Sequence, residues 1–312
     1  MKKILYVALL AMFLVGCDEG YNNNPSDENS NQSSSNDSGN KPDDAPFIPA
    51  FSVSEDKQVI FSPGNLQYTQ STNTWSFALN QYDVLGTDNV IGGGRKSLRE
   101  FGYWISGDDL ADKVDLFGRS SVANNFGITT SGSHDDYKGS FVDWGTNKIG
   151  DDDPNTWRTL TGLEWNYVVF QRSNADNLKG VAQINGINGL ILLPDDWTCP
   201  AGVTFKPGFR SIGGVNSYEL HQTFSADQWS KLEQAGAVFL PAAGYRYWTA
   251  ISSVQGYGYY WSSTTKTFIP NEGNKRNPSY TLVRLTISSD EVVVEVNENS
   301  IFGHSVRLVK DL

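Results

Sequence analysis

The sequence predicts an α+β domain in which two helices are embedded among short antiparallel strands and long loops. A capping box, Ser or Thr followed three residues later by Glu or Gln, marks a helix start at Thr161 and another at Ser225. Aromatic and β-branched residues occur in short runs, as they do in pleated, half-buried sheets. Glycine and proline separate these runs, which favours many short elements over a helical bundle.

The first residues have the features of a secretion signal. Two lysines precede an uncharged apolar run over 4–15, about a dozen residues, whereas a membrane-spanning helix needs roughly 20. The run ends in Leu-Val-Gly-Cys at 14–17, which resembles the lipobox of bacterial lipoproteins. The resemblance implies removal of 1–16 and acylation of Cys17, so that the chain contacts the membrane through its lipid anchor only. The alternative is an ordinary signal peptide with an incidental cysteine.

A polar linker is predicted at 17–46. Residues 18–44 are rich in Asn, Ser, Asp, Gly and Pro, and Tyr21 is their one large apolar residue. Such a segment is expected to be disordered, because it can bury too little apolar area to offset its ordering entropy. Asp18 and Glu19 resemble the export signal of surface lipoproteins in Bacteroidetes-type bacteria, so we expect an outer membrane lipoprotein exposed at the cell surface. The remaining residues, 47–312, suffice for one large domain.

The composition excludes some partners. Loss of the two signal-peptide lysines takes the formal net charge from −11 to −13. Nucleic acid and anionic lipid head groups both need a basic face, so we expect neither as a partner. Apart from Cys17 the only thiol is Cys199, which therefore has no partner for an internal disulfide or a thiolate metal cluster. We expect Cys199 to be a small core residue.

The N-terminal part of the domain, 47–156, is predicted to contain strands and then long loops. Apolar and polar residues alternate at 51–54 and 57–62 before a Pro-Gly pair, which indicates one strand or two short ones. Runs at 65–68 and 74–77 continue as a hairpin-like pair. The pattern then loosens, and three isolated aromatic residues are expected to attach the loops to the core: Trp104, Phe117 and Trp144.

The core motifs are expected in 157–312. After the capping box at Thr161, the residues Leu163, Tyr167 and Phe170, with Val168 beside them, are predicted to form the apolar face of the first helix. The second helix follows Ser225 and is expected to stop at Gly236. Two buried strands are predicted at 189–193 and 237–240, each ended by a proline.

The last hairpin can be placed in register from the sequence. Two β-rich runs, 280–288 and 291–297, flank a two-residue turn at 289–290. This turn sets Arg284 opposite Glu295, a pair that also serves sheet register. The apolar face is then formed by Val283, Leu285, Ile287, Val292, Val294 and Val296. A closing strand is predicted at 304–309.

Five motifs together resemble a known family. They are Trp-Arg-Thr-Leu-Thr-x-x-Glu-Trp-x-Tyr-Val at 157–168, Leu-Leu-Pro at 192–194, Phe-Leu-Pro-Ala-Ala-Gly-Tyr-Arg at 239–246, Gly-Tyr-Tyr-Trp-Ser-Ser at 258–263 and Ser-Val-Arg-Leu-Val at 305–309. In this order they resemble a set of Bacteroidales lipoproteins. They are also similar to the formylglycine-generating-enzyme-like branch of the C-type-lectin fold, with the Fibrobacter paralogous domain and the variable proteins of diversity-generating retroelements. The resemblance spans most of 47–312 but matches poorly at 90–143.

The resemblance implies a C-type-lectin-like fold in which the motifs at 258–263 and 305–309 are scaffold. In the retroelement proteins the residues between these two motifs are displayed for ligand binding. By position, the corresponding residues here are Thr265, Lys266, Phe268, Asn271, Asn274, Arg276, Asn277, Tyr280 and Arg284. The flanking aromatic residues Tyr257 and Tyr260 could stack on sugars or anchor a protein, and the alternative is that they belong to the core. Trp261 is expected in the core, and the cluster 245–248 could border the same surface.

The sequence favours binding over catalysis, with no cofactor and no metal site. The enzymatic branch of the family uses two copper-binding cysteines, and only Cys199 is available in the domain. The calcium-site tripeptides of lectins, such as Glu-Pro-Asn and Trp-Asn-Asp, are absent from the sequence. The Asp pairs and triplets at 135–136 and 151–153 lack a full ligand pattern and are interpreted as solvated turns. His134, His221 and His304 are too scattered in sequence to indicate a catalytic triad.

We therefore expect a cell-envelope lipoprotein that binds a protein or glycan ligand at the cell surface without catalysis. An adhesin at the tip of a fimbria is the alternative within binding functions. An enzyme related to the formylglycine-generating type is the alternative from a different class.

Overall fold

The computed structural model describes residues 47–85, 113–118, 141–210, 217–247, 250–268, 279–297 and 302–312. The predicted signal peptide, Cys17 and the linker lie outside these ranges, as do Trp104 and residues 134–136. None of the helices within these ranges has both the length and the apolar character that crossing a membrane requires.

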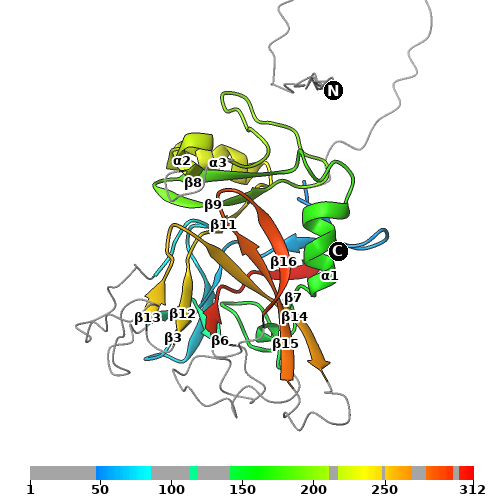
Figure 1. Ribbon diagram of the computed structural model, residues 1–312, viewed down its shortest axis with the longest axis vertical. Coiled ribbons are helices and arrows are strands. Elements are labelled where there is room, and N and C mark those ends of the chain that lie inside the picture. Colours follow the sequence, from blue (N-terminus) through cyan, green and yellow to red (C-terminus); the bar gives the residue numbers. More distant parts are fainter. Residues whose placement is uncertain are drawn as a thin grey trace, which may run out of the picture.

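The described chain is mixed α/β, with most strands in small antiparallel sheets and few helices (Figure 1). The helices are α1 (Gly162–Asn166), α2 (Ser217–His221) and α3 (Ala226–Gln234). The prediction of short antiparallel strands with helices between them is thus confirmed. Helix α2 was not predicted, because five residues are too few to establish an apolar period.

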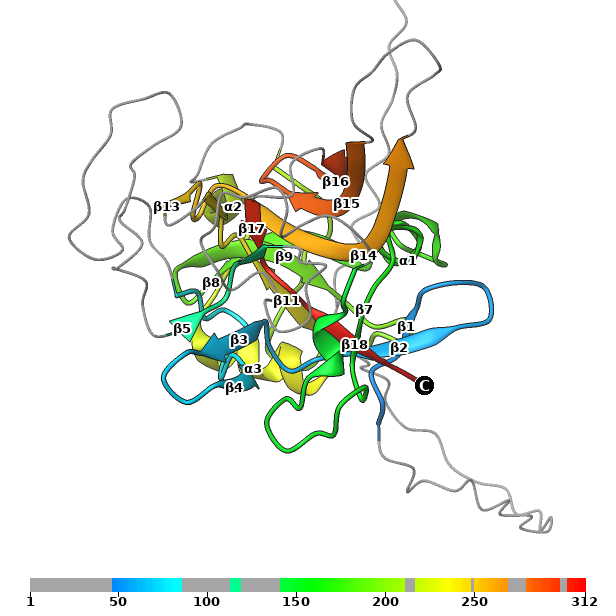
Figure 2. The same ribbon diagram turned by 90° about the horizontal axis from the view of Figure 1, so that it is seen from below.

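The first and last strands of the domain meet in one sheet. β1 (Phe51–Ser52) pairs with β2 (Gln58–Phe61), β18 (Leu308–Asp311) pairs with β2, and β7 (Arg158–Thr159) pairs with β18, all antiparallel. Figure 2 shows β18 running between β2 and β7. The predicted single closing strand is wrong, because the chain changes sheets: β17 (Phe302–His304) belongs to a different sheet from β18.

A second sheet supports α2 and α3. Its strands are β8 (Lys179–Ile184), β9 (Ile187–Leu192), β10 (Thr223–Phe224) and β11 (Val238–Pro241), and β10 is parallel to β8 while the other pairs are antiparallel. The two predicted buried strands are β9 and β11. Helix α3 has the predicted capping box at Ser225, and its Trp229 and Leu232 are buried. Gly236 follows the helix at φ +90°, a conformation that favours glycine.

Two further sheets contain the N-terminal hairpin and the strands of the loop region. One has the order β4 (Thr74–Phe77), β3 (Leu66–Thr69), β5 (Lys113–Val114). The other has the order β13 (Ala250–Ser252), β12 (Tyr245–Tyr247), β17, β6 (Phe117–Gly118). Phe117 and Trp144 are fully buried and pack in one cluster with Trp261, so their predicted role in attaching loops to the core is confirmed.

The C-terminal hairpin forms a three-stranded sheet of β14 (Gly258–Phe268), β15 (Ser279–Ile287) and β16 (Val292–Asn297). Arg284 lies opposite Glu295, so the register predicted from the two-residue turn is confirmed. Leu285, Ile287 and Val292 are buried against the main core. Between Trp261 and Thr265 the pairing of β14 with β15 shifts, which marks a bulge.

Helix α1 has the predicted capping box but buries a different face. Of the four predicted residues, Val168 is buried and Tyr167 is half-buried, whereas Leu163 is 81% exposed and Phe170 is 43% exposed. The largest buried side chain is instead that of Trp165, beside the buried Val169. After Asn166 the chain widens into a π-helical turn, η4 (Tyr167–Gln171), whose extra residue rotates the face that meets the core. Trp165 has the largest apolar area of the side chains in this helix, so the side of the helix that carries Trp165 is buried.

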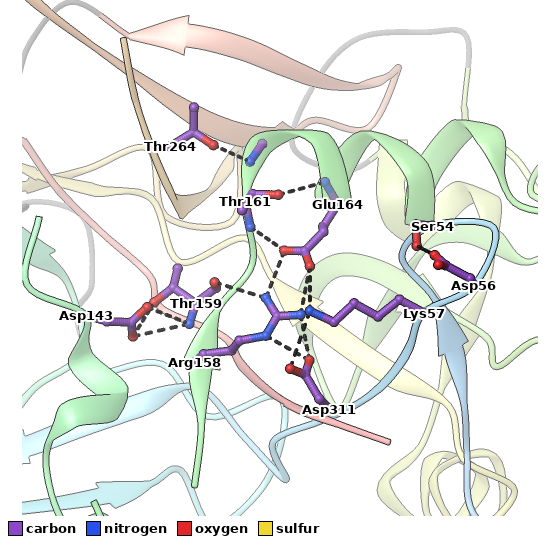
Figure 3. Close-up of polar contacts among 11 residues, drawn as sticks. Ser54, Asp56, Lys57, Asp143, Arg158, Thr159, Thr161, Glu164, Thr264 and Asp311 are labelled. Carbon is purple, nitrogen blue, oxygen red and sulfur yellow. Dashed lines mark hydrogen bonds and ion pairs between the residues drawn. The ribbon is translucent and has the colours of Figure 1, made fainter. Parts of the chain in front are cut away.

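A polar network holds the start of α1 against the last strand (Figure 3). Both carboxylate oxygens of Glu164 accept hydrogen bonds of 2.8 Å from the guanidinium of Arg158. Arg158 also donates to Asp311 on β18 at 2.8 Å, and Lys57 bridges Glu164 and Asp311. The backbone N–H of Gly162 donates to the Thr264 hydroxyl in the β14 bulge, so α1 is tied to two sheets at once.

Candidate ligand-binding surface

A cluster of tyrosine and charged side chains covers the outer face of the β14–β15–β16 sheet and the neighbouring strand β12. We call it the tyrosine–arginine face, and it consists of Tyr245, Tyr257, Tyr259, Arg284, Thr286 and Glu295. The opposite face of the same sheet carries Tyr260, Leu285 and Ile287 into the main core. Because side chains alternate along a strand, Tyr259 and Arg284 lie on the other face, which they share with the buried Trp261.

The aromatic part of the face is a packed row. The rings of Tyr257 and Tyr259 are stacked, with centroids 5.9 Å apart and planes 11° apart. Tyr245 meets the Tyr259 ring edge-on at 5.7 Å and meets Phe302 on β17 in the same way at 5.3 Å. Such contacts restrict the rings, so a ligand that packs on them would cost little side-chain entropy.

Arg284 is held on several sides. Its guanidinium carbon lies 4.5 Å from the centroid of the Tyr259 ring. Nε and Nη2 donate to Glu295 Oε1 at 3.2 and 2.9 Å, and the Thr286 hydroxyl donates to the same oxygen at 2.6 Å. Partial burial alone would raise the pKa of Glu295, but the hydrogen bonds from Thr286 and Arg284 outweigh it and lower that pKa below its ordinary value. Glu295 is therefore ionised at neutral pH.

His304 lies beneath the row and supports Arg284. Its ring is 4.3 Å from Trp261 and 5.2 Å from Tyr259 between centroids, and its Nε2 is 3.2 Å from Arg284 Nη1. A guanidinium can only donate, so Nε2 accepts and the ring proton resides on Nδ1. Complete burial, together with the charge of Arg284, lowers the pKa of His304 well below its ordinary value. His304 is therefore neutral at pH 7.

The structure brings Tyr257 and Arg284 together, two of the residues selected from the sequence. Tyr257 is 45% exposed and the Arg284 side chain 19% exposed. Tyr245, from the cluster expected to border this surface, lies beside them. The core prediction for Trp261 is confirmed, since its side chain is fully buried.

The assignment of Tyr260 to the ligand surface is wrong. Its side chain is fully buried, and its hydroxyl donates to Pro241 O at 2.9 Å and accepts from Asn65 Nδ2 at 3.2 Å. Tyr260 follows Tyr259 on the same strand and therefore points to the opposite face of the sheet. The parity of the strand thus separates Tyr260 from Tyr257 and Tyr259.

Several of the other display residues lie in strands. Thr265, Lys266 and Phe268 belong to β14, and Tyr280 belongs to β15, so the prediction of a polar loop from Thr265 onward is wrong as far as Phe268. These positions belong to a strand because β14 pairs with β15 there. Thr and Phe are also residue types that suit a pleated sheet. The remaining display residues lie outside the described ranges: Asn271, Asn274, Arg276 and Asn277.

Sequence reasoning missed the roles of Tyr259, Thr286 and Glu295. Tyr259 is not among the residues that the sequence selects, although its spacing of two from Tyr257 places both on one face. Glu295 was assigned to sheet register alone. The predicted pairing with Arg284 was the signal that could have placed it on the ligand surface.

Other polar and hollow regions serve the scaffold. A cavity of about 520 Å³ is lined by Trp197, Cys199 and Phe205, with Cys199 half-buried there. Its carboxylate, Asp195, accepts hydrogen bonds from Ser52 and Arg172 and so links β1 to the end of η4. The predicted core position of Cys199 is confirmed in part, because its side chain packs against the cluster around α3.

No metal centre is formed within the described ranges, where His, Cys, Asp and Glu do not come together in groups of three or more. Asp151, Asp152 and Asp153 are exposed turn residues, as predicted, and Asp152 accepts a hydrogen bond from the Trp157 indole. His221 and His304 lie in different elements, α2 and β17.

Comparisons of this chain with family models, with curated proteins and with solved structures found no match.

Proposed function

We propose that this protein is a cell-envelope lipoprotein, anchored through Cys17, whose C-type-lectin-like domain binds a protein or glycan ligand at the cell surface without catalysis. The tyrosine–arginine face is the binding surface. The support for the fold is the order of the five sequence motifs together with the burial of Trp261 and of residues 306–309, which the resemblance expects to be scaffold.

One observation carries the binding proposal. Arg284 is stacked on Tyr259 and bonded to Glu295 before any ligand arrives. Rings and a guanidinium that are already restrained lose little entropy on binding, and Tyr and Arg are the residues that most often dominate binding energy. The face lies on a sheet whose other side is core, so its geometry is held by the fold.

The proposal is tested by ligand capture with the purified full chain in detergent, on a glycan array and from lysates of neighbouring cells. The affinity for each captured ligand is then measured for the unchanged protein and for the variants Tyr257→Ala and Arg284→Ala. The matched control is Phe170→Ala, which removes an aromatic ring of similar exposure from η4.

We expect both face variants to weaken binding at least tenfold, while the Phe170→Ala variant binds as the unchanged protein does. If every captured ligand binds all three variants equally well, the tyrosine–arginine face is not the binding surface.

A further inference from the structure

The polar groups of the tyrosine–arginine face constrain the chemistry of its ligand. Three N–H groups of Arg284 donate hydrogen bonds to protein partners, one to His304 and two to Glu295. A guanidinium has five N–H groups, so one on each terminal nitrogen has no acceptor within the described ranges and can donate to a ligand. Among the described residues, every hydrogen bond to Glu295 ends on Oε1, so Oε2 is left to accept from a ligand, on a side chain that is 40% exposed.

Arg284, a positively charged donor, lies beside Glu295, a negatively charged acceptor, and such a pair favours a neutral ligand. An anion placed on Arg284 would meet the carboxylate of Glu295 at the same point, in a chain of formal net charge −11. A cation placed on Glu295 would meet the guanidinium. A hydroxyl group both donates and accepts, so two adjacent hydroxyls satisfy Arg284 and Glu295 together without adding charge.

The exposed ring is separated from this polar pair by one residue. Tyr257 stacks on one side of Tyr259, and Arg284 lies over the Tyr259 ring from the side of Trp261, its strand partner. A sugar ring packed on Tyr257 therefore has the Tyr259 ring between it and the Arg284–Glu295 pair. A chain of sugar units can contact both, with the apolar side of one ring on Tyr257.

The face offers a ring platform beside a few hydrogen-bonding groups. An oligosaccharide matches this combination, because its rings have apolar sides and its hydroxyls both donate and accept. Charge and spacing thus agree on one class of ligand.

We infer that the tyrosine–arginine face binds a neutral oligosaccharide, with one sugar unit packed on Tyr257 and the hydroxyls of a neighbouring unit hydrogen-bonded to Arg284 and Glu295. This inference rests on the proposed function and specifies its ligand.

The test uses the full chain in detergent and titrates oligosaccharides of matched length. The neutral probes are gluco-, manno-, xylo- and galacto-oligosaccharides, the anionic probe is oligogalacturonate and the cationic probe is a glucosamine oligomer. The neutral probe that binds most tightly is then titrated as a mono-, di- and tetrasaccharide, and the three affinities are compared. Variants are Tyr257→Ala and Glu295→Gln, with Phe170→Ala as control and thermal unfolding of each recorded.

We expect a neutral probe to bind at least tenfold more tightly than either charged probe, and its affinity to rise from mono- to tetrasaccharide. Tyr257→Ala should weaken binding of the neutral probe about tenfold. Glu295→Gln should also weaken binding of this probe. Tyr257 is exposed, so its variant keeps the test valid should Glu295→Gln unfold.

Preference for a charged probe, or neutral binding that survives Tyr257→Ala, would overturn the inference. Capture of a protein ligand that depends on Tyr257 and Arg284, with no oligosaccharide bound, would overturn the inference and leave the proposed function standing. Absence of any ligand that depends on this face would overturn both.

Discussion

The guanidinium carbon of Arg284 on β15 lies 4.5 Å from the centre of the Tyr259 ring on β14. The two residues are not directly paired, since Tyr259 faces Thr286 and Arg284 faces Trp261. The diagonal contact combines a cation–π attraction with the ion pair to Glu295, and each restrains the other. The face is therefore ordered by contacts between neighbouring strands.

Arg284→Lys is expected to weaken ligand binding nearly as much as Arg284→Ala. An ammonium group cannot reproduce the planar fork that bonds Glu295 and His304 while stacking on Tyr259. Calorimetric titration of the captured ligand measures the effect, with Lys310→Ala at an exposed position of β18 as the control for loss of a positive charge. Full affinity in the lysine variant would mean that only positive charge matters at this position.

Tyr260→Phe is expected to lower the free energy of unfolding by about 1–3 kcal/mol and leave ligand affinity unchanged. The substitution leaves Pro241 O and Asn65 Nδ2 without their buried partner. Denaturant unfolding and ligand titration together check the two halves of this prediction. Weaker binding at unchanged stability would return Tyr260 to the ligand surface.

Thr161→Ala is expected to cost about 1 kcal/mol of stability, because the Glu164 N–H loses its capping acceptor. Glu164→Ala should cost more, about 2 kcal/mol, because Arg158 and Lys57 lose their shared carboxylate as well. Ser225→Ala in α3 is the matched control, a capping box without such a network, and should cost about as much as Thr161→Ala. Equal losses for Thr161→Ala and Glu164→Ala would show that the network adds nothing.

The stability of the protein is expected to fall as the pH drops below about 6.5, in part through His304. Its folded-state pKa is lowered, so below the ordinary histidine pKa the unfolded chain takes up a proton that the folded chain does not. Each pH unit then costs up to about 1.4 kcal/mol until the folded-state pKa is reached.

The difference in stability between the unchanged protein and His304→Gln, followed from pH 7 to pH 5, isolates this effect. The subtraction removes two other groups that titrate nearby in pH: His221, whose pKa is also lowered by burial, and Asp115, whose pKa burial raises to about 6. Asp115 acts in the opposite direction, because its folded form takes up a proton as the pH falls through 6. A difference that does not change with pH would mean that His304 is accessible to protons in the folded protein.

Local signals in the sequence correctly predicted several elements. The capping boxes at Thr161 and Ser225 and the register that sets Arg284 opposite Glu295 depend on residues close in the chain, so the sequence carries them directly. The prediction of the apolar face of α1 is wrong in part. The π-helical turn η4 and the size of Trp165 determine which side of the helix is buried, and neither follows from a 3.6-residue period.

The sequence by itself determined the register that sets Arg284 opposite Glu295, and it placed Tyr257, Tyr260 and Arg284 on one surface only through the family resemblance. Only the tertiary structure decided that Tyr257 is exposed and that Tyr260 is buried. Tyr260 is drawn inward by the core on one side of the sheet, and Tyr245 and His304 arrive on the other side from β12 and β17. Contacts between strands far apart in the chain depend on how whole sheets pack, and periodicity within one strand does not carry that information.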